Sequence, residues 1–123
     1  MANVFLAKSV RAKRETGAGY RNTTSRILAG PAQGCNNATV RVLTIRPEGR
    51  VPRREFDSQR IITLLQGELI FMDGDGSMHM LGEGDTVIIH PHERYHFRND
   101  SSKNARIMII ESRGRTSLTT LTE

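Results

Sequence analysis

Apolar and polar residues alternate along most of the chain after residue 20, and turn-forming residues interrupt this alternation at short intervals. The stretch "NNATVRVLTI", residues 36–45, is typical of the pattern. Because successive side chains of a strand point to opposite faces, a period of two predicts half-buried strands. Short strands at close spacing indicate a barrel or a sandwich. No segment shows a convincing helical period, so we expect an all-β chain.

We predict eight strands, at residues 23–28, 39–45, 59–65, 68–72, 77–81, 86–90, 95–98 and 105–111. The stretches "GPAQGCNN" and "RPEGRVP" contain residues that favour chain reversal, and we interpret both as turns. The stretch "MDGDGSM" predicts a hairpin, because Asp-Gly is a strong hairpin signal. Its Asp73, Asp75 and Ser77 also resemble part of a calcium loop, but the distal Glu of such loops is missing from its place.

The core of this β fold should come from the apolar members of the alternating segments. We expect it to contain Val40, Val42, Ile62, Leu64, Leu69, Phe71, Val87, Ile89, Ile107 and Ile109.

A chain of 123 residues fits a single domain with a core of its own. We expect an N-terminal segment at 1–22, a barrel at 23–112 and a C-terminal tail or edge strand at 113–123. The first segment carries Val4, Phe5, Leu6 and Val10 without an obvious core, so we expect it to contribute to a homodimer, with exchange between subunits as one arrangement.

Charge and cysteine content narrow the location and the partners. The single Cys35 cannot form an internal disulfide, and the apolar run at residues 4–7 is too short for a signal peptide or a membrane span, which favours the cytoplasm and no membrane partner. The formal net charge of +5 invites a nucleic-acid hypothesis. However, the arginines alternate with apolar residues in the strand segments, as Arg41 and Arg46 do, and this is typical of a solvated face rather than a nucleic-acid site.

Residues 47–99 resemble the cupin family, small RmlC-like β-barrels whose two motifs normally hold a divalent metal. The first motif runs G-x5-H-x-H-x3-E-x6-G; the second has Gly-Asp, a proline-containing turn, a histidine and a downstream Asn. The frame from "PEGRVP" to "LLQGEL" and the stretch "GEGDTVIIHPHERYHFRN" match the spacing and the apolar and glycine positions of these motifs. The resemblance implies an all-β, cupin-type antiparallel β-barrel (an RmlC-like jelly roll).

The metal-ligand positions implied by this resemblance carry other residues. We take Gly49 and Gly67 as the two glycines of the first motif, and the ligand positions fall on Arg54, Phe56 and Arg60. Arginine stays protonated and offers donors without a lone pair, and phenylalanine has no ligand atom. We therefore expect no metal and no other cofactor at this place.

The histidine position of the second motif falls on Tyr95 when it is counted without a gap to Asn99, whereas a shift by one residue would place His96 there. We prefer Tyr95. Because Tyr95 and His96 are neighbours in one strand, their side chains should point to opposite faces, so His96 would point outward if Tyr95 points inward. Three histidines, His90, His92 and His96, leave open an alternative in which the chain is a metal-binding cupin that uses this cluster.

The expected function follows from the substituted ligands. If Arg54, Phe56 and Arg60 share an inward face with Tyr95 and Phe97, the barrel would hold a pocket for a small anionic ligand, since a buried guanidinium needs a negative partner. Tyr95 or His96 would then transfer protons in a metal-independent isomerisation, epimerisation or cyclisation. Whether the chain is an enzyme stays open, with a non-catalytic binding or sensor cupin as the alternative.

Overall fold

The computed structural model describes residues 2–112 of the chain. In chain order its elements are η1 (Ala7–Ser9), β1 (Lys13–Arg14), β2 (Arg21–Ala29), η2 (Pro31–Gln33), β3 (Ala38–Arg54), β4 (Arg60–Gln66), β5 (Leu69–Met72), β6 (Met78–Leu81), β7 (Thr86–Ile89), β8 (Tyr95–Arg98) and β9 (Ala105–Ser112). All eight predicted strands are present, and the helical elements of the described chain are two short 3-10 turns. The all-β expectation is confirmed.

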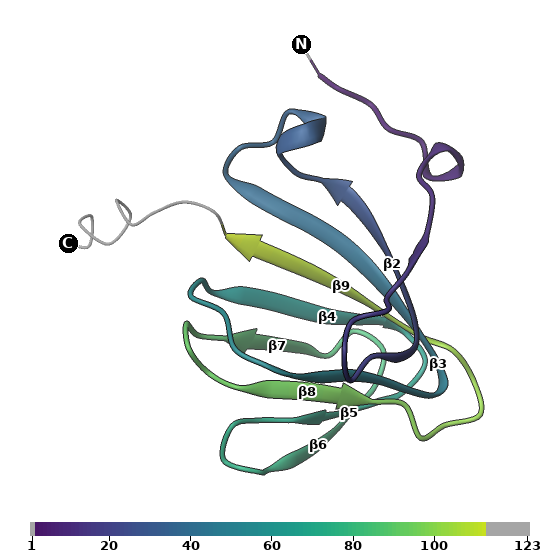
Figure 1. Cartoon of the computed structure of the whole chain (residues 1–123), viewed down its shortest axis with the longest axis vertical. Helices are drawn as coiled ribbons and strands as arrows, with labels where there is room; N and C mark the ends of the chain where they lie inside the picture. Colours follow the sequence, from purple (N-terminus) through teal and green to yellow (C-terminus); the bar gives the residue numbers. More distant parts are fainter. Residues whose placement is uncertain (1, 113–123) are drawn as a thin grey trace, which may run out of the picture.

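All strand pairs are antiparallel, and the main path through the sheet is β6-β5-β8-β3-β9-β4-β7, with β2 on β3 and β1 on β2. The sheet curls so that β5, β6 and β8 lie below β4, β7 and β9 in Figure 1. This curled antiparallel sheet agrees with the antiparallel β-barrel that the sequence predicted.

Strand β3 joins the two halves of the barrel, and here one predicted turn is wrong. The stretch "RPEGRVP" lies inside β3 and does not reverse the chain. Glu48 adopts φ +66°, and the strand crosses from pairing with β9, where Ile45 faces Ala105, to pairing with β8, where Arg50 faces Arg98. The turn-forming residues therefore bend a continuous strand, because backbone pairing is available on both sides of the bend.

The predicted hairpin between β5 and β6 is present. Asp73 and Ser77 are joined by a backbone hydrogen bond of 3.0 Å, and the amides of Asp75 and Ser77 donate to the Asp73 carboxylate at 3.2 and 3.1 Å. One carboxylate oxygen of Asp73, a residue of the stretch that resembles a calcium loop, thus accepts the hydrogen bonds that close the turn.

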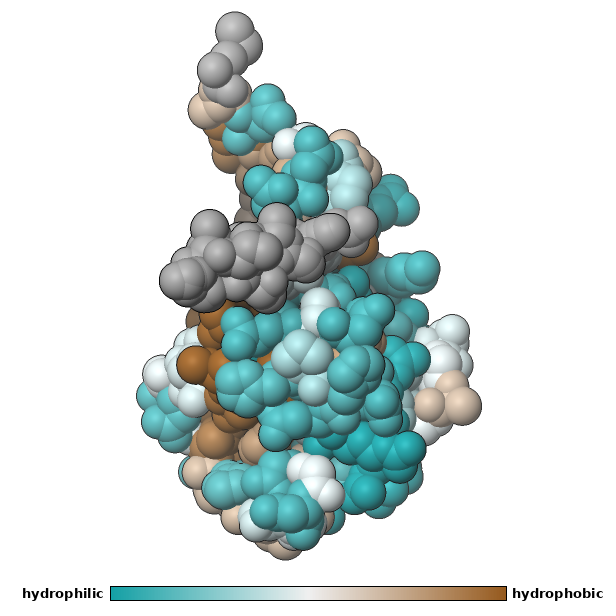
Figure 2. All heavy atoms as spheres, turned by 90° about the vertical axis from the view of Figure 1, so that its left-hand side faces the viewer, coloured by the Kyte–Doolittle hydropathy of each residue, from teal (hydrophilic) through white to brown (hydrophobic). Residues whose placement is uncertain are grey.

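The core lies between the two halves of the sheet. Eight of the ten predicted core residues are buried. Val40 and Val87 are only half-buried, and the inward face of β3 is formed instead by Leu43 and Ile45, which are 3% and 0% exposed. Because Val42 and Leu43 in "VRVLTI" are consecutive apolar residues, alternation alone does not predict which side chains of β3 face the core. Figure 2 looks at the end of the barrel where β4 begins and β9 ends, and shows a mainly hydrophilic surface with a hydrophobic band along one side.

Candidate functional site

Five of the six residues that the sequence proposed for a site line one narrow cavity inside the barrel. They are Arg54, Phe56, Arg60, Tyr95 and Phe97. Glu15 and Tyr20, from the segment between β1 and β2, and Arg41, from β3, add polar groups. We call this space the arginine cavity. Its volume is about 20 Å³, which is room for about one water molecule.

Arg60 is the buried charge of this cavity, with 6% of the residue exposed. One terminal nitrogen lies 3.3 Å from Oε2 of Glu111, and the other donates to the Tyr95 hydroxyl at 3.4 Å. Its guanidinium stacks on the Phe56 ring, with the central carbon 3.3 Å from the ring centroid. Its Nε is buried and has no partner among the described residues, so the cation keeps one unused donor.

Arg54 does not point inward beside Arg60, and this part of the expectation is wrong. The residue is exposed, donates from Nη1 to the Tyr20 hydroxyl at 3.2 Å and lies 5.2 Å from the centre of that ring. Two neighbouring guanidinium groups repel each other, and the one at the end of β3 can stay hydrated. Arg54 therefore forms the rim of the arginine cavity together with Tyr20.

Tyr95 points into the barrel, with 4% exposed, and packs against Phe56, Phe71 and Phe97 at ring distances of 6.2, 6.2 and 5.8 Å. Burial raises the pKa of its phenol, although the neighbouring Arg60 acts in the opposite direction. The hydroxyl accepts from Arg60 and retains its own proton for donation.

His96 lies on the opposite face of β8 and does not line the arginine cavity. It is half-buried, its Nδ1 has no partner among the described residues, and its pKa is lowered by burial and then by Arg53, Arg98 and Arg50. The structure thus separates His96 from Tyr95, as strand alternation requires.

The three histidines of the alternative metal site are not brought together. His90 approaches Gln59 at 3.4 Å, and Nδ1 of His92 lies 3.7 Å from Glu55. Among residues 2–112 no group of three or more His, Cys, Asp or Glu side chains could hold a metal ion. The metal that the cupin resemblance implies does not fit the four barrel positions either, because two are arginines, one is a phenylalanine and the raised pKa of Tyr95 disfavours a phenolate ligand.

The count of the first motif needs one correction. Counted back from Gly67, the motif would again assign its ligand positions to Arg54, Phe56 and Arg60, but its first glycine position would be Glu48 rather than Gly49. Glu48 adopts a left-handed conformation that favours glycine. Asn99, the last residue of the second motif, is fully buried and donates to the carbonyls of Ile45 and Lys103, so its role is structural.

Sequence reasoning did not place three polar side chains, Glu111, His79 and Asp73, near Tyr95. Glu111, the partner of Arg60, follows Ile107 and Ile109 on the inward face of β9, and the alternation could have revealed it. A second cavity of about 340 Å³, which we call the side cavity, also reaches Tyr95 and is lined by His79 and Asp73. The pattern of "HML" places His79 on the same face as the buried Leu81.

Comparison with known proteins agrees with this architecture. Residues 41–111 match the family described as "Cupin domain". No curated protein matches the sequence. None of the helices in the described part of the chain is long and apolar enough to cross a membrane.

Three solved structures illustrate the similarity in fold. The polyketide cyclase RemF from Streptomyces resistomycificus superposes with a TM-score of 0.85 at 21% identity, over 94% of this chain and 82% of that one. An RmlC-like cupin from Shewanella frigidimarina gives 0.76 at 10% identity, over 96% of both chains. A sugar phosphate isomerase of the cupin superfamily from Silicibacter pomeroyi gives 0.75 at 17% identity, over 87% and 73%. Together with the family match, which spans more than half of the sequence, these structures lead to one conclusion: the chain belongs to the cupin family.

Proposed function

We propose that this cupin binds a small anionic organic molecule in the arginine cavity and does so without a metal ion. The observation that carries the proposal is the buried Arg60, which has an unused Nε donor and shares the Tyr95 hydroxyl. Guanidinium is the side chain best suited to carboxylate and phosphate recognition. Arg41 and Arg54 add positive charge to the lining, against Glu15.

The small volume of the cavity defines how such a ligand would bind. The cavity has space for about one water molecule, so it can hold a single oxygen of a carboxylate or enolate. To bind the rest of the ligand, the side chains of Arg54 and Tyr20 at the rim must move apart. The rim contact between Arg54 and Tyr20 is made by an exposed side chain, so its opening costs little. Arg54 would then turn to the ligand while Arg60 holds the inner oxygen.

The chemistry available to this site is proton transfer on an anion that the arginines stabilise. Because its raised pKa keeps Tyr95 protonated, this residue serves as a donor to a developing enolate or alkoxide. Isomerisation, epimerisation or cyclisation are the reaction classes that this arrangement supports. The similar structures include a polyketide cyclase and a sugar phosphate isomerase, which agrees with these classes without selecting one.

A non-catalytic binding cupin is the second candidate, and the pairing of Arg60 with Glu111 favours it. A cation that already has a carboxylate partner stabilises a developing charge less than a free one. Turnover distinguishes the two candidates. If the cupin is an enzyme, Tyr95→Phe should abolish most turnover of a bound compound while binding survives; if it is a binding module, bound compounds stay unchanged in wild type.

Calorimetry with a panel of small carboxylates, phosphates and sugar acids tests the binding proposal. Because a charge-assisted contact contributes about 1.5 kcal/mol at the lower end of its range, Arg54→Met should weaken binding roughly tenfold. Arg46→Met is the matched control, since Arg46 is exposed on β3 and does not line the cavity. If no anion binds wild type more tightly than Arg54→Met, the proposal is wrong.

A further inference from the structure

The side cavity on the other flank of Tyr95 has the properties of a separate ligand site. Its volume of about 340 Å³ falls in the range of small-molecule pockets. Its inner wall is apolar, with Phe71, Leu81, Val87 and Ile89 between the edges of β5, β6 and β7. Polar groups gather on the remaining wall, where His79, Asp73, Glu93 and Arg94 line the cavity.

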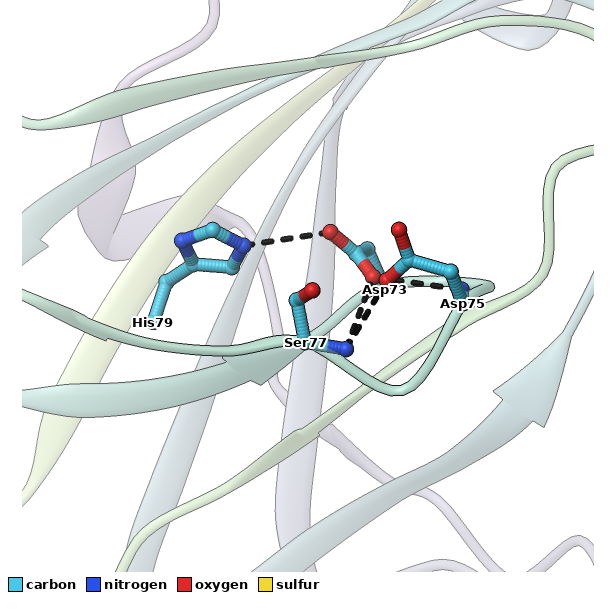
Figure 3. Close-up of polar contacts among 4 residues, drawn as sticks. All are labelled: Asp73, Asp75, Ser77 and His79. Atoms are coloured by element: carbon cyan, nitrogen blue, oxygen red, sulfur yellow. Dashed lines mark hydrogen bonds and ion pairs between the residues drawn. The ribbon is translucent and has the colours of Figure 1, made fainter.

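His79 and Asp73 form a fixed pair on this wall. Nε2 of His79 lies 3.1 Å from Oδ2 of Asp73, across the mouth of the β5–β6 hairpin. The other carboxylate oxygen, Oδ1, accepts the backbone amides of Asp75 and Ser77, so the carboxylate cannot rotate freely. Figure 3 shows the imidazole facing Asp73 with one nitrogen and directing its second nitrogen to the opposite side of the ring.

This geometry selects one form of the imidazole. When the ring is neutral, an Nε2–H bond to Asp73 leaves the lone pair on Nδ1. The ring also packs against Phe71, with the ring centres 5.8 Å apart, while 51% of the His79 side chain is exposed. A histidine oriented by a carboxylate is the common arrangement of a general base, and here it borders a cavity with an apolar interior.

We propose that the side cavity binds a small, largely apolar carbonyl compound and that His79 removes a proton from the carbon next to the carbonyl. In this step the C–H bond breaks, its electron pair forms the enolate and the proton goes to Nδ1 of His79. The imidazolium then returns a proton to carbon, so the cycle needs no oxidant, reductant or second substrate. Asp73 is a positioning residue, which holds the imidazole in the form that accepts the proton.

This inference does not depend on the anion site proposed for the arginine cavity. The two cavities share only Tyr95, and neither Arg54 nor Arg60 lines the side cavity. Arg54→Met should therefore leave the chemistry of His79 unchanged. Failure of one proposal leaves the other standing.

Deuterium exchange into 2-tetralone, followed by proton NMR in D₂O with the full chain, tests the proposal. This ketone has an apolar body and acidic hydrogens beside its carbonyl. Wild type should accelerate exchange over His79→Gln by roughly 100-fold, the lower end of what a positioned base contributes. His90→Gln is the matched control, because His90 is exposed and does not line the side cavity, and it should exchange like wild type.

The variant Asp73→Asn adds a second measurement, the position of the ring proton of His79. A purely structural role of Asp73 would not change this position. Asparagine can keep the turn by accepting the same two amides through Oδ1, but its NH₂ group would donate to Nε2 of His79 and move the ring proton to Nδ1. Nitrogen-15 shifts should show Nε2–H in wild type and Nδ1–H in the variant, with exchange lost in the variant. Equal exchange by wild type and His79→Gln, or an Nδ1–H ring in wild type, would overturn the proposal.

Discussion

Arg60 places a buried charge in the interior of the barrel. Its guanidinium is held by Glu111, the Tyr95 hydroxyl and the face of Phe56, three partners from three different parts of the chain. A cation in this position needs negative and aromatic neighbours where a metal would need lone pairs. The side chain is therefore both a structural element of the core and the donor of the proposed ligand site.

Removal of this cation should destabilise the fold. Arg60→Met leaves Glu111 without its ion-pair partner, with only the Ser58 hydroxyl still donating to it at 3.2 Å, and the free energy of unfolding should fall by about 3 kcal/mol, the lower end for broken buried pairs. The double variant Arg60→Met with Glu111→Leu should recover most of this loss, because both charges are then removed. Urea unfolding measures both variants; equal stability of the single variant and wild type would contradict the pairing.

We expect His96 to make the free energy of unfolding depend on pH near neutrality. Its pKa is lowered in the folded state by burial and by Arg53, Arg98 and Arg50, so the unfolded chain binds a proton more readily. Its contribution is complete above the ordinary histidine value of about 6.5 and is lost as pH falls through the lowered pKa. The unfolding free energy of wild type should therefore fall between neutral pH and pH 5 more steeply than that of His96→Gln. Parallel pH profiles in thermal unfolding would refute this role.

Metal content is a further prediction for the residues of the barrel. Because Arg54, Phe56, Arg60 and Tyr95 supply no suitable ligand set, we expect purified protein to carry no stoichiometric transition metal in the barrel. Elemental analysis checks this. One zinc, iron, manganese or nickel ion per chain, retained in a His90→Gln and His92→Gln double variant, would show that the motif count is wrong.

The turns that join the strands set the register of the sheet. Gly67, in the turn between β4 and β5, is constrained both by its backbone conformation and by the space around it. It adopts φ +88° between β4 and β5, and an added Cβ would lie 2.5 Å from the carbonyl oxygen of Asn104. Gly76, in the β5–β6 hairpin, has a similar φ of +90° with no atom within 4 Å of the same position. The two glycines share a conformation and differ in the space around them.

Alanine substitutions separate these two effects. Gly76→Ala should cost only the left-handed conformation, about 1–2 kcal/mol. Gly67→Ala should cost about 1–3 kcal/mol more, because the new methyl group collides with backbone that cannot move easily. Equal losses of unfolding free energy in the two variants would show that the β4–β5 turn can relax around the added group.

At the scale of the whole molecule, the barrel exposes apolar side chains that suit a second subunit. Val4, Phe5 and Leu6 are 77%, 51% and 55% exposed in the segment that precedes β1. On the outer face of the sheet, Ile61 and Ile88 are cross-strand neighbours and are 37% and 55% exposed. Apolar surface of this kind is typical of an interface, and the homodimer stays a prediction that these surfaces support.

Sedimentation at micromolar concentration tests the dimer. Wild type should sediment as a dimer, and Phe5→Ser with Leu6→Ser should shift it towards the monomer, because the apolar contact of the N-terminal segment is lost. Lys8→Ser is the control, since Lys8 is exposed in the same segment and carries no comparable apolar surface. A monomeric wild type would contradict the prediction.

The sequence by itself determined the strands, the hairpin at residues 73–77 and most of the core, because alternation and turn chemistry are local properties. Alternation also required Tyr95 and His96 to point to opposite faces of β8, and the count to Asn99 favoured Tyr95 as the inward residue, but the structure was needed to show which of the two is buried. The spacing of the cupin motifs pointed to Arg54, Phe56, Arg60 and Tyr95, which all line the arginine cavity, although the inward direction expected for Arg54 was wrong.

Only the tertiary structure decided how the charges are used. Arg54 contacts Tyr20 at the rim, whereas Arg60 pairs with Glu111, a residue far along the chain. No local sequence pattern predicts which of the two arginines of the motif is buried. The side cavity with His79 and Asp73 likewise exists only where the edges of β6 and β7 approach each other. Electrostatic pairing and cavity shape depend on which distant segments are brought together, and alternation along a strand carries no information about them.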